Sequence, residues 1–363
     1  MNTMRLCALA ATLAVAATSA QAAGKELNVY NWSDYIAEGT VPAFSKATGI
    51  KVRYDVYDSM EVLRAKLMTG RSGYDVVVPT NNTLDLGIKA GFFQPVDKSK
   101  LPNYKSLDPE LLKLMSQFDA GNKFGVPYFW GVITLAINED KVKKALGGPL
   151  PANQWDLFFK PEYVSKLKGC GVSVLDSPSE FFPVALKYYG KNPNSDAEAD
   201  YQGVMPALKT VRPYITRFSS SGYINEMAGG DVCLALGYGG DLNIAKRRAE
   251  EAKNGVKINV LMPKGVAIWV DSMAIPKDAA NVESAHAFIN AMLDAKTAAA
   301  NANAVTYAPG VLSARPFVDK KYLANRSIFP TADDVKNGFI MQTVSPKTIR
   351  TYTRLWQSFK TGR

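Results

Sequence analysis

The chain has 363 residues, which at roughly 150 residues per domain is enough for two domains. Hydrophobic residues make up 47% and charged residues 21%, a globular composition that excludes a disordered or collagen-like chain. The net charge is +10, and the single histidine, His286, excludes multi-histidine metal sites and mechanisms that need two imidazole bases. Any chemistry would have to rest on carboxylates, hydroxyls, lysines or aromatic side chains. We expect no metal, no cofactor and no catalytic residue.

The N-terminus predicts a cleavable secretory signal. Arg5 precedes an apolar run from Leu6 to Ala17, and Ala20-Gln21-Ala22 supplies the small residues of a cleavage site. The run is too short to span a bilayer, and a buried N-terminal helix is the alternative interpretation. We expect residues 1–22 to be a signal peptide and the mature protein to be periplasmic. The loss of Arg5 lowers the net charge from +10 to +9.

Strands and helices alternate in the first half of the mature chain. The pattern predicts strands over 27–32, 51–57 and 75–79, a helix over 41–48, and a second helix capped by Ser59. This alternation is typical of parallel βαβ units and therefore of an α/β fold, in which ligands bind at the carboxyl ends of the strands.

A second α/β region is predicted after Val126-Pro127-Tyr128. Strands are expected over 133–137, 171–175, 232–237, 256–262 and 267–275, and a helix is expected to begin at Glu139. Because the chain has neither an internal repeat nor a low-complexity linker, we expect two lobes joined by extended crossover segments.

Cys170 and Cys233 remain after signal cleavage. An even pair in an oxidising compartment is typical of a disulfide, and two buried free thiols are the alternative.

The basic residues are scattered. The densest cluster, Lys246-Arg247-Arg248, continues into Glu250-Glu251 and predicts a solvated helix face, so we do not expect nucleic-acid binding.

Nucleotide-binding and redox motifs are absent from the sequence: there is no G-x-G-x-x-G opening a helix, no P-loop and no C-x-x-C pair. The stretch Gly237–Asp241 is rich in glycine, but its terminal aspartate would repel a phosphate. His286 lies on a predicted helix, where a structural or surface role is expected.

Three segments pair an aromatic residue with a carboxylate near a strand end: Trp32-Ser33-Asp34-Tyr35, Tyr238-Gly239-Gly240-Asp241 and Trp269-Val270-Asp271. Alternation along a strand places Trp269 and Asp271 on one face. Carboxylates accept hydrogen bonds from ammonium groups, and aromatic faces attract cations and cover methylene chains. Each pair alone is also compatible with core packing beside a surface charge, but together they indicate a site for an organic amine.

Further segments carry a family resemblance. They are Val29-Tyr30-Asn31-Trp32-Ser33-Asp34-Tyr35-Ile36, Tyr54-Asp55-Val56-Tyr57-Asp58-Ser59, Tyr74-Asp75-Val76-Val77-Val78-Pro79, Trp155-Asp156-Leu157, Cys170-Gly171-Val172-Ser173 and Ala252-Lys253-Asn254-Gly255-Val256. In these segments the sequence resembles the periplasmic polyamine-binding proteins of ABC transporters. The segments occur in the same order as in that family, and the resemblance covers essentially the whole mature chain. The resemblance implies a receptor without enzyme activity that passes a polyamine to an inner-membrane ABC permease, and a Cys170–Cys233 disulfide. We expect it to act as a monomer.

The fold implied is the type II periplasmic-binding-protein fold, with two α/β lobes joined by a two-strand hinge that close on the ligand. We expect lobe 1 to comprise residues 24–130 and 258–304, and lobe 2 to comprise residues 131–257 and 305–363.

The ligand-contacting positions of the family fall on thirteen residues. They are Trp32, Ser33, Asp34, Tyr35, Thr80, Glu180, Ser220, Tyr238, Asp241, Arg248, Trp269, Asp271 and Tyr307. The resemblance implies that the acids hold the terminal ammonium groups and that the aromatic rings enclose the methylene groups.

Departures from the family pattern bear on the choice of ligand. Trp269 resembles the spermidine-preferring members, whereas putrescine-preferring members tend to have phenylalanine there. Tyr238 stands where many putrescine receptors have tryptophan, Asn81-Asn82 replaces smaller residues beside Thr80, and Met341 matches neither type. We expect spermidine to be favoured over putrescine. Two alternatives remain. One is a receptor of the same fold for another amine or small ligand, such as an amino acid, an opine or a ferric ion. The other is a secreted carboxylate-dependent hydrolase.

Overall fold

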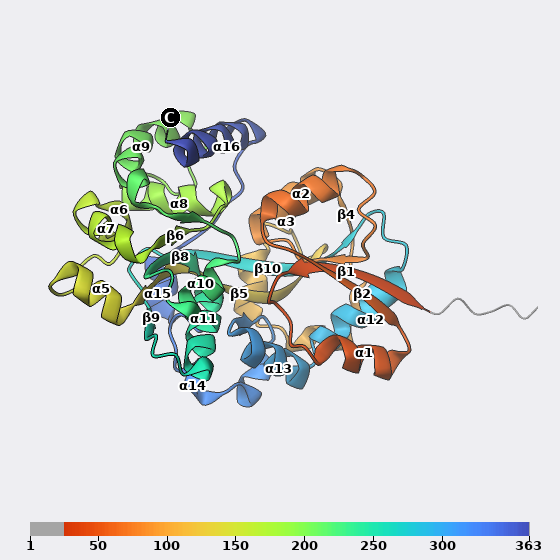
Figure 1. The fold of residues 1–363 in the computed structure, drawn as a ribbon. Helices are drawn as coiled ribbons and strands as arrows, with labels where there is room; N and C mark the ends of the chain where they lie inside the picture. Colours follow the sequence, from red (N-terminus) through yellow and green to blue (C-terminus); the bar gives the residue numbers. More distant parts are fainter. Residues whose placement is uncertain (1–24, 363) are drawn as a thin grey trace, which may run out of the picture.

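The computed structural model describes residues 25–362, so the predicted signal peptide lies outside the described residues. Two α/β lobes lie side by side and are joined by two long strands, β5 (Gly125–Asn138) and β10 (Ala267–Pro276) (Figure 1). Between residues 25 and 362, none of the helices has the length and apolar character needed to cross a membrane.

Lobe 1 is formed by the first part of the chain and two later helices. Its elements are β1 (Glu26–Trp32), α1 (Thr40–Thr48), β2 (Lys51–Tyr57), α2 (Met60–Met68), β3 (Val76–Val77), α3 (Asn81–Lys89), β4 (Phe93–Gln94), η1 (Lys98–Lys100), η2 (Pro102–Ser106), α4 (Pro109–Met115), α12 (Val282–Met292) and α13 (Ala295–Val305). Strand β1 pairs in parallel with β2 and β3, as the alternation predicts. The predicted cap is also confirmed, because the Ser59 hydroxyl accepts a hydrogen bond from the Val62 N–H at the start of α2.

Lobe 2 contains α5 (Glu139–Leu146), α6 (Asp156–Phe159), α7 (Pro161–Leu167), η3 (Lys168–Cys170), β6 (Val172–Val174), α8 (Pro178–Tyr188), α9 (Glu198–Val211), η4 (Arg212–Tyr214), β7 (Arg217–Phe218), α10 (Tyr223–Gly229), β8 (Leu234–Tyr238), α11 (Gly239–Ala252) and β9 (Ile258–Val260). Strand β6 pairs in parallel with β7 and β8.

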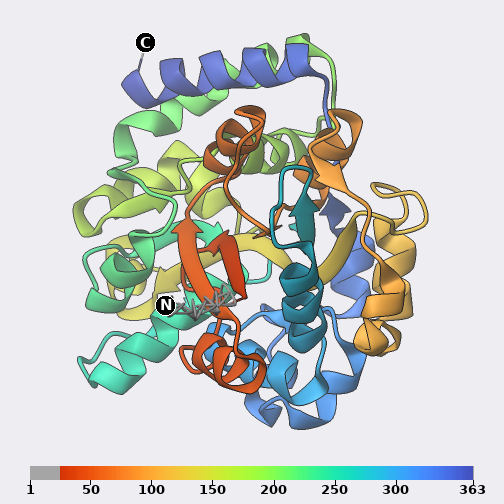
Figure 2. The same ribbon diagram turned by 90° about the vertical axis from the view of Figure 1, so that its right-hand side faces the viewer.

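The last part of the chain contains β11 (Ala308–Pro309), η5 (Leu312–Phe317), α14 (Lys320–Leu323), α15 (Ala332–Asn337), β12 (Phe339–Ile340) and α16 (Pro346–Thr361). Helix α16 packs on α8 and α9, with its buried Trp356 and Phe359 against Phe181. In the view of Figure 2, lobe 1 faces the reader and α16 of lobe 2 extends along the top.

The sheet is mixed: strands pair in parallel within the βαβ units, and the centre of the sheet is antiparallel. The strand order is β2-β1-β3-β10-β5-β8-β6-β7, and β10 is antiparallel to both β3 and β5. The reason is the hinge itself: β5 runs from lobe 1 into lobe 2 and β10 runs back, so the two neighbouring strands have opposite directions.

The strand pairing bears on two of the predicted lobe boundaries, at residues 258 and 305. Strand β9 pairs with the end of β5 at Ala136–Asn138, next to β8, which groups β9 with the strands of lobe 2. After residue 305 the chain still contacts lobe 1, since Val311 bridges Leu107. We therefore propose β5 and β10 themselves as the boundaries.

A register shift in the central strand pair lies at Asp271. Val270 pairs with Trp130 and Ser272 pairs with Pro127, so two residues of β5 lie opposite the single residue Asp271. Asp271 instead forms an isolated bridge with Thr80 of lobe 1. Such a bulge redirects a side chain away from the regular ladder, and here it does so where the two lobes meet.

Cys170 and Cys233 form a disulfide, which confirms that prediction and excludes two free thiols. The bond joins the end of η3 to the residue before β8, across a sequence separation of 63 residues.

We expect reduction of this disulfide to lower the free energy of unfolding by about 2–4 kcal/mol, because the unfolded chain regains the freedom of a long loop. Urea denaturation with and without reductant measures the difference. A Cys170→Ser/Cys233→Ser variant is the control, since it should show the lower stability in both conditions. Equal stability of the wild-type protein with and without reductant would contradict the prediction.

Candidate functional site

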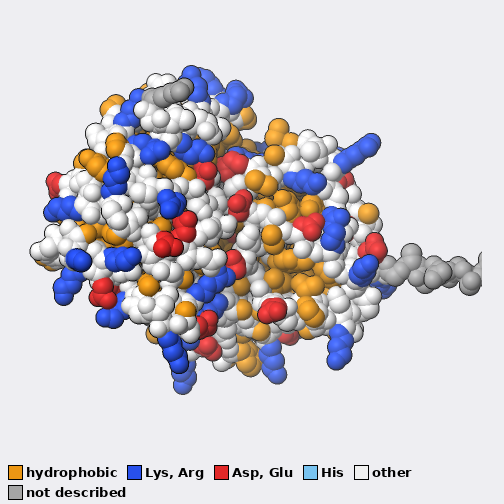
Figure 3. Space-filling view, in the orientation of Figure 1, with side chains coloured by type: hydrophobic (Ala, Val, Ile, Leu, Met, Phe, Trp, Pro, Cys, Tyr) orange, Lys and Arg blue, Asp and Glu red, His pale blue; other side chains and the backbone are white. Residues whose placement is uncertain are grey.

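A cavity of about 420 Å³, including the space open to solvent, lies between the two lobes. Its wall consists of Trp32, Ser33, Tyr35, Tyr57, Asp58, Thr80, Ser220, Ser221, Ile224, Tyr238, Asp241, Trp269, Asp271 and Tyr307. Figure 3 shows several acidic side chains along the boundary between the lobes, with lysine and arginine spread over the outer surface. The wall itself, within residues 25–362, contains three carboxylates and no basic side chain.

The sheet explains why residues so far apart in sequence meet here. Trp32 and Tyr57 end the neighbouring parallel strands β1 and β2, and Thr80 follows β3. Tyr238 ends β8 in the other lobe. The carboxyl ends of these strands point toward the lobe boundary, which is where α/β sheets bind ligands.

Aromatic rings form most of the wall. Tyr238 lies between Trp32 and Trp269, with ring centroids 5.9 Å and 6.0 Å away, and Trp269 contacts Tyr307 at 5.4 Å. The Trp269 indole lies directly over Gly131 of β5, where a Cβ atom would come within 2.8 Å of the ring. Gly131 therefore leaves the space that the indole occupies beside the hinge strand.

Asp241 is held by two tyrosines. Its carboxylate accepts hydrogen bonds from the Tyr223 hydroxyl at 2.7 Å and from the Tyr307 hydroxyl at 2.6 Å. Gly237 and Gly240 leave space for these rings, since a Cβ atom would lie 2.6 Å from Tyr223 and 2.3 Å from Tyr307. The glycine-rich stretch therefore serves to position a carboxylate, not to bind a phosphate.

Asp271 accepts a hydrogen bond from the Thr80 hydroxyl at 2.7 Å. Burial raises the pKa of Asp271 to about 7 and that of Asp241 to about 6, although the hydroxyl donors on each partly oppose the rise. Among residues 25–362, neither carboxylate forms an ion pair with a basic side chain. Both are thus buried acceptors that a cation would stabilise.

Four wall residues have a buried polar atom without a hydrogen-bond partner in the described structure. These atoms are Trp32 Nε1, Tyr35 Oη, Tyr238 Oη and Trp269 Nε1. Buried polar groups are normally hydrogen-bonded, so the concentration of unpartnered polar atoms in this wall indicates a binding cavity and not a packed core.

Ten of the thirteen expected ligand-contacting residues line this cavity, and Asp34, Glu180 and Arg248 do not. Arg248 and Asp34 pair with each other across the lobes, with Nη2 and Oδ1 2.7 Å apart, so Arg248 does not lie on a merely solvated helix face. Glu180 is buried, and its pKa is held well above the usual value by burial and then by the charge of Glu61.

The sequence interpretation missed Tyr57, Asp58, Ser221 and Ile224. Tyr57-Asp58 follows the same aromatic–carboxylate pattern at a strand end and could have been found by it. Ser221 and Ile224 come from the start of α10, where no pattern in the sequence identifies them.

His286 is not part of the cavity. It is buried on α12, its Nε2 accepts a hydrogen bond from the Asp97 N–H at 2.9 Å, and its Nδ1 lies 2.8 Å from the Val282 carbonyl. This confirms the expected structural role. Groups of three or more His, Cys, Asp or Glu side chains that could hold a metal ion do not occur between residues 25 and 362.

Comparisons with known proteins agree on one family. The family of bacterial extracellular solute-binding proteins matches residues 40–330. The putrescine-binding periplasmic protein SpuD of Pseudomonas aeruginosa strain UCBPP-PA14 is 47% identical over 98% of both chains. The putrescine-binding periplasmic protein PotF of Escherichia coli K12 is 46% identical over 97% of this chain and 96% of its own.

A solved structure from Listeria monocytogenes, provisionally named a spermidine/putrescine ABC transporter, has a TM-score of 0.83 and 30% identity. It covers 93% of this chain and 100% of its own. The expected fold is thus confirmed over nearly the whole described structure.

We expect Asp271→Asn to stabilise the ligand-free protein at pH 8. Because the native pKa of about 7 lies above that of an unfolded aspartate, the native state binds more protons, and the free energy of unfolding falls as the pH rises through this range. An asparagine cannot ionise, so the gain should be about 1–3 kcal/mol at pH 8 and should disappear near pH 4.

Urea denaturation at the two pH values measures this gain. Asp140→Asn is the control and should change stability by less than about 1 kcal/mol at both pH values, because Asp140 makes only a solvent-exposed ion pair with Lys257. An Asp271→Asn protein less stable than wild type at pH 8 would refute the assignment of a strained buried charge.

Proposed function

The chain belongs to the bacterial extracellular solute-binding proteins, and we propose that it is a periplasmic receptor that captures a polyamine, foremost putrescine, for an ABC importer. The relatives at 46–47% identity, which match nearly their whole length, are named putrescine-binding periplasmic proteins. Their names and the chemistry of the cavity support the same ligand class.

One observation carries the proposal: two buried carboxylates, Asp241 and Asp271, lie in an aromatic cavity without a basic partner. Removing an ammonium group from water is costly unless it meets an opposite charge and hydrogen-bond acceptors. A diammonium chain would supply one positive charge to each carboxylate. Its methylene groups would pack against the rings of Trp32, Tyr238 and Trp269, whose faces also attract cations.

Charge counting favours a diamine over a triamine. The third carboxylate of the wall, Asp58, is exposed, so within the wall a third ammonium group would lack a buried partner. The expected preference for spermidine is not confirmed, since the relatives with 46–47% identity are named for putrescine. We propose spermidine as a weaker second ligand.

Calorimetric titration of ligand-stripped protein tests the proposal. We expect one putrescine per chain, bound more tightly than spermidine. Asp241→Asn should weaken binding by about 2–5 kcal/mol, because an ammonium group loses its charged partner, whereas Asp140→Asn in the same lobe should bind like wild type. The proposal fails if neither amine gives a signal, and its ligand order fails if spermidine binds more tightly.

A second prediction concerns the selection of chain length by Trp269. We expect Trp269→Phe to increase the preference for putrescine by a few-fold, because the smaller ring removes apolar surface beyond the length of a diamine. The ratio of the two dissociation constants measures the effect. An unchanged ratio would separate Trp269 from chain-length selection.

Binding should also depend on pH through the carboxylates. Lowering the pH from 8 to 5.5 protonates Asp271 and then Asp241, so the affinity for putrescine should fall by up to about tenfold per pH unit for each group. In Asp271→Asn the decrease near pH 7 should be absent. A pH-independent affinity in the wild-type protein would contradict ion pairing with these two groups.

A further inference from the structure

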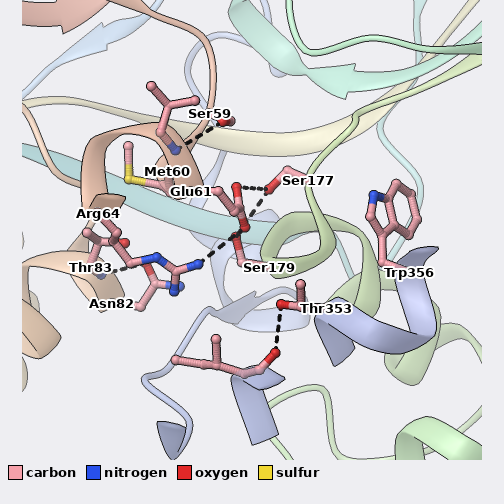
Figure 4. Close-up of polar contacts among 12 residues, drawn as sticks. Ser59, Met60, Glu61, Arg64, Asn82, Thr83, Ser177, Ser179, Thr353 and Trp356 are labelled. Carbon is pink, nitrogen blue, oxygen red and sulfur yellow. Dashed lines mark hydrogen bonds and ion pairs between the residues drawn. The ribbon is translucent and has the colours of Figure 1, made fainter. Parts of the chain in front are cut away.

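A second polar contact between the lobes lies outside the cavity. The Glu61 carboxylate of α2 in lobe 1 accepts hydrogen bonds from two hydroxyls at the start of α8 in lobe 2, Ser177 at 3.1 Å and Ser179 at 2.8 Å (Figure 4). We call these three residues the Glu61 contact. None of them lines the cavity, and they are separate from the Arg248–Asp34 pair, which joins α11 to the loop after β1.

The local geometry is favourable for a carboxylate. Ser177 occupies the N-cap position of α8, but its hydroxyl makes no capping bond within that helix and donates to Glu61 instead. Glu61 therefore lies beside the N-terminal end of α8, where the helix dipole favours a negative charge. It also lies in the first turn of its own helix, α2, which adds a second favourable dipole.

Arg64 holds the Glu61 side chain from within α2. Its Nη2 lies 3.5 Å from Glu61 Oε1, one helical turn away. The side chains of Arg64 and Glu61 are only 18% and 28% exposed, so water competes less for this contact than for an ordinary surface pair. The ion pair thus helps to hold the acceptor in its orientation toward lobe 2.

The contact also places a residue next to the cavity. Glu180 directly follows Ser179 on α8, is buried, and has an oxygen without a partner in the described structure. It lies near enough to Tyr238 and Asp271 to act on both electrostatically. Anchoring the start of α8 to lobe 1 therefore fixes the side of lobe 2 that faces the ligand.

We propose that Glu61 is a positioning residue that holds the two lobes closed over bound ligand through Ser177 and Ser179, and so sets the rate at which the ligand leaves. The hydrogen bonds join residues of different lobes, so they break whenever the cleft opens. Their loss should therefore speed ligand release and leave ligand capture by the open form nearly unchanged.

Stopped-flow tryptophan fluorescence with putrescine tests this proposal, which rests on the proposed function. Trp32 and Trp269 line the cavity and report its occupancy. We expect Glu61→Ala to raise the dissociation rate about 5- to 20-fold and to change the association rate less than about twofold, since charge-assisted hydrogen bonds are among the stronger ones. Glu61→Gln, which keeps an acceptor but loses the charge, should fall between wild type and Glu61→Ala.

The matched variant removes the donors from the other lobe. Ser177→Ala/Ser179→Ala should raise the dissociation rate to the same extent, and combining it with Glu61→Ala should add nothing further. Glu110→Ala, an exposed glutamate of lobe 1 outside the contact, is the control and should release ligand like wild type. A dissociation rate within twofold of wild type in Glu61→Ala, or additive effects in the triple variant, would overturn the proposal.

A wrong assignment of the ligand can be distinguished from a wrong assignment of the role of the Glu61 contact. If wild-type protein does not bind putrescine, the ligand assignment is wrong. The contact is then judged by small-angle X-ray scattering of natively purified proteins with whatever ligand they retain. A larger radius of gyration in both Glu61→Ala and Ser177→Ala/Ser179→Ala than in wild type supports the contact, and equal radii overturn it.

Discussion

The cost of burying two carboxylates without a positive partner governs this structure. Asp241 and Asp271 receive hydrogen bonds from Tyr223, Tyr307 and Thr80, but hydroxyls cannot balance a full charge in an aromatic cavity. Closing the lobes over an empty cavity would therefore dehydrate both acids at a loss, whereas closing them over a dication removes that loss. Ligand binding and lobe closure are thermodynamically one event, because the same two charges determine both.

The hinge places one of these charges where both lobes meet. Strands β5 and β10 form the connection, and Asp271 lies at their bulge, bonded to Thr80 of lobe 1. Tyr238 and Asp241 come from lobe 2. A chain molecule lying between Asp241 and Asp271 would therefore connect lobe 2 with the hinge itself, so that a short ligand would bias the relative orientation of the lobes.

Local patterns in the sequence predicted much of this arrangement. The first βαβ units and the Ser59 cap depend on neighbouring residues and are confirmed. The aromatic–carboxylate segments also depend on local pattern, and all but Asp34 of their aromatic and acidic residues line one cavity. The antiparallel centre was not predicted, because the direction of β10 depends on pairing with β5, more than 100 residues earlier. The pairing of Arg248 with Asp34 was missed for the same reason: a basic run on a helix looks solvated until the opposite lobe is in place.

The position of α16 has a consequence for the order of folding. Trp356 and Phe359, among the last residues of the chain, complete the core of lobe 2 around Phe181. Lobe 1 likewise needs α12 and α13 from beyond the second crossing. Each lobe therefore completes its core only with residues from beyond the second crossing, so its native packing depends on contacts between segments far apart in the sequence. Such late completion suits a protein proposed to cross a membrane before it folds.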